Sequence, residues 1–304
     1  MSKRFVAVGE CMVEMSGGED RQYRLGYAGD TLNTAWYARA LLPEGWSVDY
    51  VTAVGDDRYS EEMVAFIADA GIGTASMRRI AGKRPGLYLI HQEKGDRKFT
   101  YWRDSSAARL LADDGPALNA ALGGADIVYF SGITMAILDP RARGRMLNAI
   151  VAAREAGALV AFDPNIRPAL WSSDDVMRSV ITSAATISDI VLPTHSDEAP
   201  VFGDTDVEGT AKRYLALGVR EVAVKDGGNP ALIATADETV LVAPRPDARI
   251  IDPTGAGDSF NGSYLSSRMK GLGLGESATA AHATAAAVVG HKGALVDRNL
   301  LKLD

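Results

Sequence analysis

Residues 252–260, with the sequence DPTGAGDSF, form the segment of the chain best suited to chemistry. The small residues at 255–257 let a ligand approach the backbone closely. They open a stretch with helical character that we expect to reach about residue 270, and the first N–H groups of a helix have no partner within it and bear the positive end of its dipole. The segment therefore predicts a phosphate site, with Asp258 beside it as a base for an attacking hydroxyl. The structural alternative is a well-capped helix with an acidic first turn.

Two further segments place polar groups where a ligand could bind. Residues 225–228 (KDGG) directly follow an apolar run, and turns at the carboxyl end of parallel strands are common ligand sites. Gly29 and Asp30 precede a predicted helix whose first turn holds Asn33, which suits the binding of sugar hydroxyls. The alternatives are a tight turn for the first segment and a simple N-cap for Asp30.

Two arginines suggest an acidic ligand. Arg103 ends the segment YWR at 101–103, and Arg167 ends NIR at 165–167, just after an apolar run. A guanidinium group matches a carboxylate with two parallel hydrogen bonds and keeps its charge when partly buried. The alternative is that both are ordinary surface arginines.

The elements that must position these residues alternate along the chain. Short apolar runs predict strands at 5–9, 48–54, 126–131, 159–163, 189–193 and 221–225, with a β-rich segment at 239–251. Between them, helices are predicted at 30–42, 57–70, 139–156, 174–185 and 207–217. Asp139 and Pro140 form a helix start, and Gly157 and Gly218 stand where helices end. The alternation predicts a parallel sheet covered by helices on both faces.

Two segments, 11–27 and 86–102, lack helical periodicity. Within the second, residues 87–91 and 98–102 predict a hairpin around the polar turn 92–97 (QEKGDR). We interpret both segments as a small β-sheet lid inserted into a single domain spanning residues 1–304. We expect its apolar face to be buried against a second subunit, because exposed edges and apolar surface are otherwise left in water.

Composition and missing motifs exclude several classes of protein. The chain has 304 residues and a net charge of −7, which argues against a general nucleic-acid binder. Its single cysteine, Cys11, cannot form an internal disulfide, and no apolar run is long enough for a signal peptide or a membrane span, so we expect a cytoplasmic protein. There is no P-loop, no GxGxxG after the first strand, and no His/Cys cluster typical of a metal site.

Together these segments resemble the ribokinase-like, or PfkB, family of carbohydrate kinases over nearly the whole chain. The segments that carry the resemblance are 9–15, 29–34, 50–55, 84–88, 101–103, 130–133, 163–171 and 252–260. The resemblance implies a three-layer α/β/α core with a mostly parallel sheet and a β lid that often forms a dimer contact. Within the family, the YWR segment and residues 165–171 look most like kinases that phosphorylate the terminal 6-hydroxyl of 2-dehydro-3-deoxygluconate with ATP.

The resemblance also implies a role for each candidate residue. Asp258 would be the general base, and the backbone of Gly255, Ala256 and Gly257 would hold the transferring phosphate. The sugar pocket would be lined by Gly29, Asp30, Asn33, Tyr88, Tyr101, Arg103 and Arg167, with the two arginines meeting the substrate carboxylate. The nucleotide would lie near Asn165, Arg167, Lys225, Gly227, Gly228 and, on a helix at 276–290, His282.

The chain departs from the family pattern in two segments, at Thr194 and Asp197 and at Ile166. Many members have Asn-x-x-Glu, a motif tied to magnesium, where this chain has Thr194 and Asp197; Asp197 would then act on Mg²⁺ through water. Ile166 stands where similar kinases often have tyrosine. Asp252 and Thr254 could help to bind a monovalent cation, as in some relatives.

Two other functions stay open at the level of the sequence. One is a neutral-sugar kinase of the fructokinase or ribokinase type, which would not need two arginines at its pocket. The other is a catalytically silent sugar-acid-binding relative, although such proteins usually lose the base or the glycines that are present here. The sequence does not distinguish the gluconate from the galactonate epimer, and it does not fix the size of the expected homodimer or larger homo-oligomer.

Overall fold

The main body of the protein is built on one eight-stranded sheet. The computed structural model describes residues 3–17, 22–93, 96–246 and 249–301. The strand order is β14-β13-β12-β11-β10-β9-β1-β4. The strands of this sheet are β1 (Lys3–Val8), β4 (Trp46–Val51), β9 (Ile127–Ser131), β10 (Leu159–Asp163), β11 (Ile190–Val191), β12 (Glu221–Val224), β13 (Ala231–Ala234) and β14 (Thr239–Val242). The run from β4 to β12 is parallel, and β13 and β14 add an antiparallel edge.

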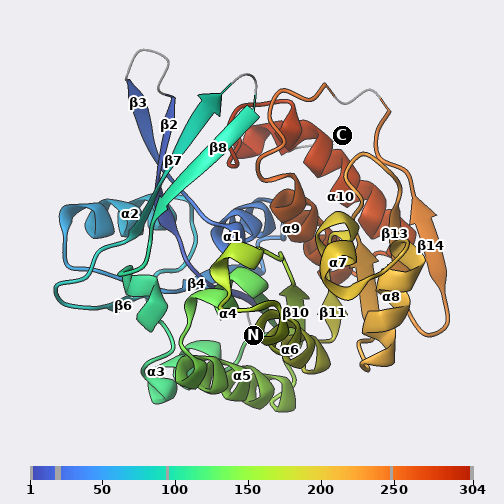
Figure 1. Cartoon of the computed structure of the whole chain (residues 1–304), viewed down its shortest axis with the longest axis horizontal. Coiled ribbons are helices and arrows are strands. Elements are labelled where there is room, and N and C mark those ends of the chain that lie inside the picture. The colour runs from blue at the N-terminus through green and yellow to red at the C-terminus, as the bar shows by residue number, and fades with distance from the viewer. Residues whose placement is uncertain (1–2, 18–21, 94–95, 247–248, 302–304) are drawn as a thin grey trace.

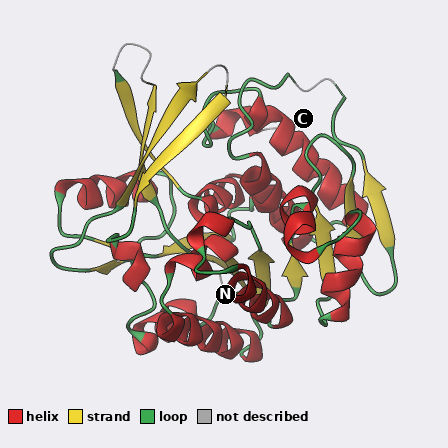
Figure 2. Cartoon of the chain, viewed as in Figure 1, coloured by secondary structure: helices red, strands yellow, loops and turns green. Residues whose placement is uncertain are grey.

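Helices cover both faces of this sheet (Figures 1 and 2). The helices are α1 (Asp30–Leu41), α2 (Arg58–Asp69), α3 (Gly115–Leu122), α4 (Gly132–Ile137), α5 (Pro140–Glu155), α6 (Asp174–Thr186), α7 (His195–Phe202), α8 (Val207–Ala216), α9 (Ala256–Met269) and α10 (Leu274–Val289). Side chains alternate along each strand, so Phe5 faces the core shared with α1, α2, α9 and α10, while Val6 faces the core shared with α3, α5, α6 and α8. The predicted three-layer α/β/α architecture is confirmed.

The predicted helix ends are also found. The Asp139 carboxylate accepts hydrogen bonds from the backbone N–H groups of Arg141 (2.7 Å) and Ala142 (2.9 Å), which caps α5. Gly157 and Gly218 have φ angles of 105° and 91°, in the left-handed region that ends helices.

Some boundaries differ from the prediction. The apolar run at 48–54 is divided at Thr52 because β5 (Ala53–Val54) leaves the main sheet and pairs with β6 (Arg78–Arg79). The β-rich segment at 239–251 contains only β14, since the chain leaves the sheet after Val242. Strand β13 and helices α3, α4 and α7 were not predicted, because they are short and carry little periodicity.

The two segments without helical periodicity form a second sheet that projects from the body (Figure 1). Its order is β3-β2-β7-β8, from strands β2 (Met12–Gly17), β3 (Tyr23–Ala28), β7 (Gly86–Glu93) and β8 (Asp96–Trp102). The predicted turn at 92–97 was too long, because the strands pair as far as Glu93 and Asp96; residues 94–95 lie outside the described residues. The predicted lid sheet is therefore present. Among the described residues, we find no helix with the length and apolar character needed to cross a bilayer.

Candidate active site

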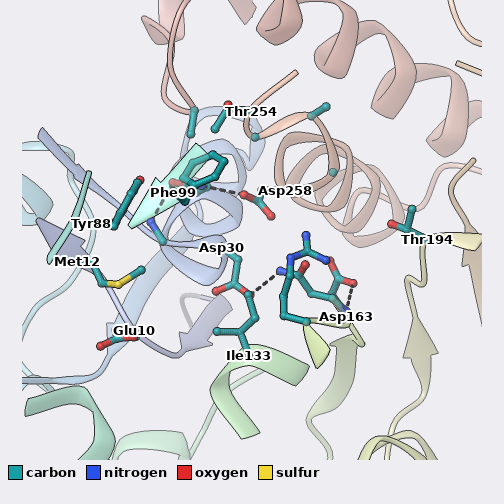
Figure 3. A pocket seen from close by; sticks show the side chains of 18 of the residues that line it. Glu10, Met12, Asp30, Tyr88, Phe99, Ile133, Asp163, Thr194, Thr254 and Asp258 are labelled. Atoms are coloured by element: carbon teal, nitrogen blue, oxygen red, sulfur yellow. Dashed lines mark hydrogen bonds between the residues drawn. The ribbon is translucent and has the colours of Figure 1, made fainter. Parts of the chain in front are cut away.

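A cavity of about 780 Å³ lies where the strands of the main sheet end and the lid begins. The body contributes Glu10 after β1, Ile133 after β9, Asp163 at the end of β10, Thr194 after β11 and Lys225 after β12. The lid contributes Met12, Tyr88, Phe99 and Tyr101. Figure 3 shows side chains from both parts around one space. The carboxyl edge of a parallel sheet is the usual place for such a site.

Most of the residues singled out in the sequence meet at this cavity. Its lining includes Gly29, Asp30, Asn33, Tyr88, Tyr101, Arg103, Asn165, Arg167, Asp197, Lys225, Gly255, Ala256, Gly257 and Asp258. Gly227, Gly228 and His282 are not part of this lining among the described residues. His282 lies on α10 and faces the end of β14, since its Nε2 is 3.0 Å from the Val242 carbonyl oxygen.

Asp258 stands in the first turn of α9 and points toward the cavity (Figure 3). Its Oδ2 accepts a hydrogen bond of 2.8 Å from Asn33 Nδ2 on α1. Burial, and then the nearby Asp30 carboxylate, raise the pKa of Asp258 to about 7. A carboxylate whose pKa lies near neutrality is well matched to accept a proton in catalysis.

Gly255 shapes the loop before Asp258, which we call the anion loop (residues 252–257). Its φ of +78° lies in the left-handed region, and a Cβ built on it would lie 2.8 Å from the Ala294 carbonyl oxygen. The Ala256 N–H donates to the Pro253 carbonyl (3.2 Å), which tightens the loop. The loop thus needs glycine, and it leads into the first turn of α9, where helix N–H groups face a ligand.

A buried polar cluster lies behind the anion loop. The Lys225 ammonium contacts Asp163 Oδ2 at 3.1 Å and Asn261 Oδ1 at 3.0 Å, and Asn261 Nδ2 donates to Asp163 Oδ2 at 2.6 Å. All three residues are buried. A Cβ built on Gly257 would lie 3.7 Å from the Lys225 Nζ, so this positive charge borders the anion loop.

Asn165 ties the loop after β10 to the start of α1. Its φ of 35° is left-handed, a strained conformation for a residue other than glycine that asparagine tolerates better than most. Its N–H donates to Asp163 Oδ1 (3.0 Å) and its Nδ2 donates to Asp30 Oδ2 (2.8 Å). Burial raises the pKa of Asp30, and the bond from Asn165 opposes that rise. The side chain of Asn165 therefore contacts a residue of the predicted sugar pocket.

The two arginines have different surroundings. Arg103 is buried and forms an ion pair with Glu10, whose other carboxylate oxygen accepts a hydrogen bond of 2.5 Å from Ser106 Oγ. Arg103 Nε has no hydrogen-bond partner among the described residues. Arg167 is half exposed, and its Nη1 lies 2.9 Å from Asp197 Oδ2. Arg103 is therefore fixed in place, whereas Arg167 is open to the cavity.

Ile166, between these groups, is 3% exposed and packs into the core beneath α6. Arg167, the next residue, lines the cavity.

The sequence reasoning gave no role to four polar residues that line the cavity or lie behind it: Glu10, Asp163, Thr34 and Asn261. Thr34 Oγ1 donates to the backbone carbonyl of Asp258 (3.2 Å). Position along the chain could have indicated three of them. Glu10 and Asp163 stand at the ends of apolar strands, and Asn261 lies three residues after Asp258, on the same side of a helix.

The chain is similar to known proteins over nearly its whole length. The sequence profile described as pfkB family carbohydrate kinase matches residues 2–299. The chain is 37% identical over 302 residues to a 2-dehydro-3-deoxygluconokinase of Dickeya dadantii (strain 3937), covering 97% of each protein. It is 36% identical over 308 residues to a 2-dehydro-3-deoxygluconokinase of Escherichia coli (strain K12), covering 99% of each. The crystal structure of a PfkB protein from Polaromonas sp. JS666 superposes with a TM-score of 0.84 at 27% identity, covering 99% of each chain.

Proposed function

The chain belongs to the pfkB family of carbohydrate kinases, and from this premise we propose that it transfers the terminal phosphate of ATP to the 6-hydroxyl of 2-dehydro-3-deoxygluconate. The full-length similarity to two kinases of that name supports the choice of substrate. The observation that carries the proposal is Arg167, a half-exposed guanidinium in the same cavity as Asp258. A neutral sugar offers this guanidinium no group of opposite charge, whereas a substrate carboxylate can pair with it.

In the proposed complex, the two ends of the substrate meet different parts of the cavity. The carboxylate pairs with Arg167 in exchange for Asp197, and Arg103, which is held by Glu10 and also lines the cavity, faces the same carboxylate. Gly29, Asp30, Asn33, Tyr88 and Tyr101 line the space between the arginines and the base.

The chemical step follows from the surroundings of Asp258. Its carboxylate, oriented by Asn33, accepts the proton of the substrate 6-hydroxyl while that oxygen forms a bond to the terminal phosphorus of ATP and the bond from phosphorus to the leaving ADP oxygen breaks. The backbone N–H groups of Gly255 and Gly257 hold the negative charge of the transferred group. The Ala256 N–H donates instead to the Pro253 carbonyl and shapes the loop. Lys225 adds a positive charge beside them.

The site also suits ATP and magnesium. The open anion loop fits a phosphate group, and Asp197, 30% exposed at its side chain, offers the hard oxygen donor that Mg²⁺ prefers, through water. When bound, Mg²⁺ would neutralise charge on the ATP phosphates. Gly227 and Gly228 would border the nucleotide outside the described cavity.

A coupled assay of ADP release tests the proposal. The purified protein is given ATP with 2-dehydro-3-deoxygluconate, its galactonate epimer, fructose or ribose, each with and without Mg²⁺. We expect turnover with the sugar acids that requires Mg²⁺, and phosphorus NMR should show the ester on the 6-oxygen. The Asp258→Asn protein, purified in parallel, controls for contaminating kinases. Preferred use of fructose or ribose would indicate the neutral-sugar alternative, and binding without turnover would indicate a silent relative.

A further inference from the structure

The segment after α10 forms a wall against the anion loop. We call residues 293–296 the C-terminal strap. Its Gly293 N–H donates to Asp252 Oδ2 at 2.6 Å, and the backbone of Ala294 packs against Gly255. A Cβ on Gly255 would lie 2.8 Å from the Ala294 carbonyl oxygen and 2.9 Å from its Cα. The left-handed conformation of Gly255 is therefore held from outside by the strap.

Tyr37, on α1, holds the strap in place. Its side chain is fully buried, and its hydroxyl donates to the Ala294 carbonyl oxygen at 2.5 Å. The same hydroxyl accepts a hydrogen bond from the Val296 N–H at 3.3 Å. Burial raises the pKa of Tyr37, so the phenol keeps its proton and remains a donor. The oxygen that Tyr37 holds is the one that contacts Gly255.

The position of Tyr37 on its helix links it to the base. Asn33 and Tyr37 are four residues apart on α1 and thus lie on one face. Asn33 donates to Asp258, and Tyr37 donates to the strap. Gly262 on α9 allows the two helices to approach closely, since a Cβ there would lie 2.7 Å from the Thr34 carbonyl oxygen and from Tyr37 Cβ. One face of α1 therefore contacts Asp258, which directly follows the anion loop, and the strap that packs against the loop.

We propose that Tyr37 is a positioning residue for phosphoryl transfer, which holds the Ala294 carbonyl against Gly255 and so keeps the anion loop aimed at the transferred phosphate. The inference rests on the proposed ATP-dependent activity. Among the described residues, the cavity lining includes Ala294 and Gly255 but not Tyr37, so Tyr37 acts through them. Removing its hydroxyl leaves the Ala294 carbonyl and the Val296 N–H without this partner inside the protein.

The test compares Tyr37→Phe with Tyr264→Phe. Tyr264 is also a fully buried tyrosine, on α9, and its hydroxyl donates to Glu221 Oε1 at 2.7 Å, away from the anion loop. Both variants lose one buried hydroxyl and have a similar expected loss of melting temperature. We expect kcat of Tyr37→Phe to fall by roughly 10- to 100-fold, as for a small misplacement of catalytic groups, with the KM for the sugar within about twofold of wild type. Tyr264→Phe should keep its kcat.

Calorimetry with nucleotides adds a readout that does not depend on the sugar. Tyr37→Phe should bind a non-hydrolysable ATP analogue roughly tenfold more weakly than wild type, the scale of one hydrogen bond. Its affinity for ADP should stay unchanged, because ADP lacks the phosphate that meets the loop. The inference is wrong if wild type binds the ATP analogue and Tyr37→Phe has the same ratio of analogue affinity to ADP affinity as wild type. It is also wrong if Tyr264→Phe loses as much kcat as Tyr37→Phe. Absence of nucleotide binding by wild type would overturn the proposed function and the inference together. Failure to use sugar acids alone would overturn only the proposed substrate.

Discussion

Replacing Asp258 by asparagine should stabilise the free protein while it removes the base. The folded structure raises the pKa of Asp258 from 3.8 to about 7, mainly by burial and by the Asp30 carboxylate. Because the folded state holds this proton more tightly than the unfolded chain does, the stability it contributes is fully present below about pH 4 and is lost as the pH rises through about 7. Asparagine carries no charge at any of these pH values, so Asp258→Asn avoids the loss.

The size of the effect follows from the shift in pKa. Each unit is worth about 1.36 kcal/mol, so the free energy of unfolding of Asp258→Asn should exceed that of wild type by at most about 4 kcal/mol at pH 8. Water in the cavity reduces this value. At pH 5, only the interval between the ordinary pKa of 3.8 and pH 5 contributes, so the gain in free energy of unfolding should be at most about 1.6 kcal/mol. The bond from Asn33 survives, since an amide oxygen also accepts it.

Urea unfolding of both proteins at pH 5 and pH 8 measures this difference, and Asp69→Asn, at an exposed position near the end of α2, is the matched control. The same proteins are assayed for kcat at pH 8, where Asp258→Asn should lose about 10²–10⁴-fold because it cannot accept the proton. A stability gain that is equal at the two pH values would contradict the raised pKa. A variant that keeps more than about a tenth of the wild-type kcat, when chemistry limits turnover, would contradict the role of base.

Three further predictions concern the pH profile of the wild-type protein, the role of Arg167 and the surface of the lid. The kcat/KM of wild type should rise with pH through about 7, as Asp258 ionises in the free enzyme; a profile that is flat between pH 6 and pH 8 would count against it. Arg167→Ala should lower kcat/KM for a sugar acid by about 30- to several-thousand-fold and leave a neutral sugar nearly unaffected; equal losses for both would confine Arg167 to phosphate binding or structure. The lid exposes Trp102, 56% exposed, so sedimentation at micromolar concentration should show a dimer that Trp102→Glu dissociates; wild type that is only monomeric would reject the lid interface.

Much of the architecture was predictable because it depends on local patterns. Apolar runs of strand length, helical stretches between them, and residues such as Asp139 and Gly157 indicated a parallel sheet with helices on both faces. The lid strands were predicted from the absence of helical periodicity. The boundaries that failed are those decided by pairing: only the β5–β6 contact divides the run at 48–54, and no local feature of that run reports it.

The candidate site also contains residues that the sequence could predict and contacts that it could not. Residues 252–258 could be recognised from the sequence, because the glycines before the helix and its acidic first turn are contiguous in the chain. The neighbours of Asp258 could not be predicted in this way. Asn33 lies 225 positions away, and Asp30 comes close to Asp258 only because α1 packs against α9. The pairing of Arg103 with Glu10 spans 93 positions, and it makes one arginine a fixed part of the pocket while Arg167 remains open.

The sequence by itself determined which chemical groups are present and, through local propensity, which elements carry them. The tertiary structure alone decided their electrostatics. The pKa of Asp258 reaches about 7 because burial removes water from its carboxylate and brings Asp30 close to it, and both effects depend on distances in space. The role inferred for Tyr37 has the same origin, because its hydroxyl meets Ala294 only when helix α1 and the end of the chain, 257 positions apart, pack together.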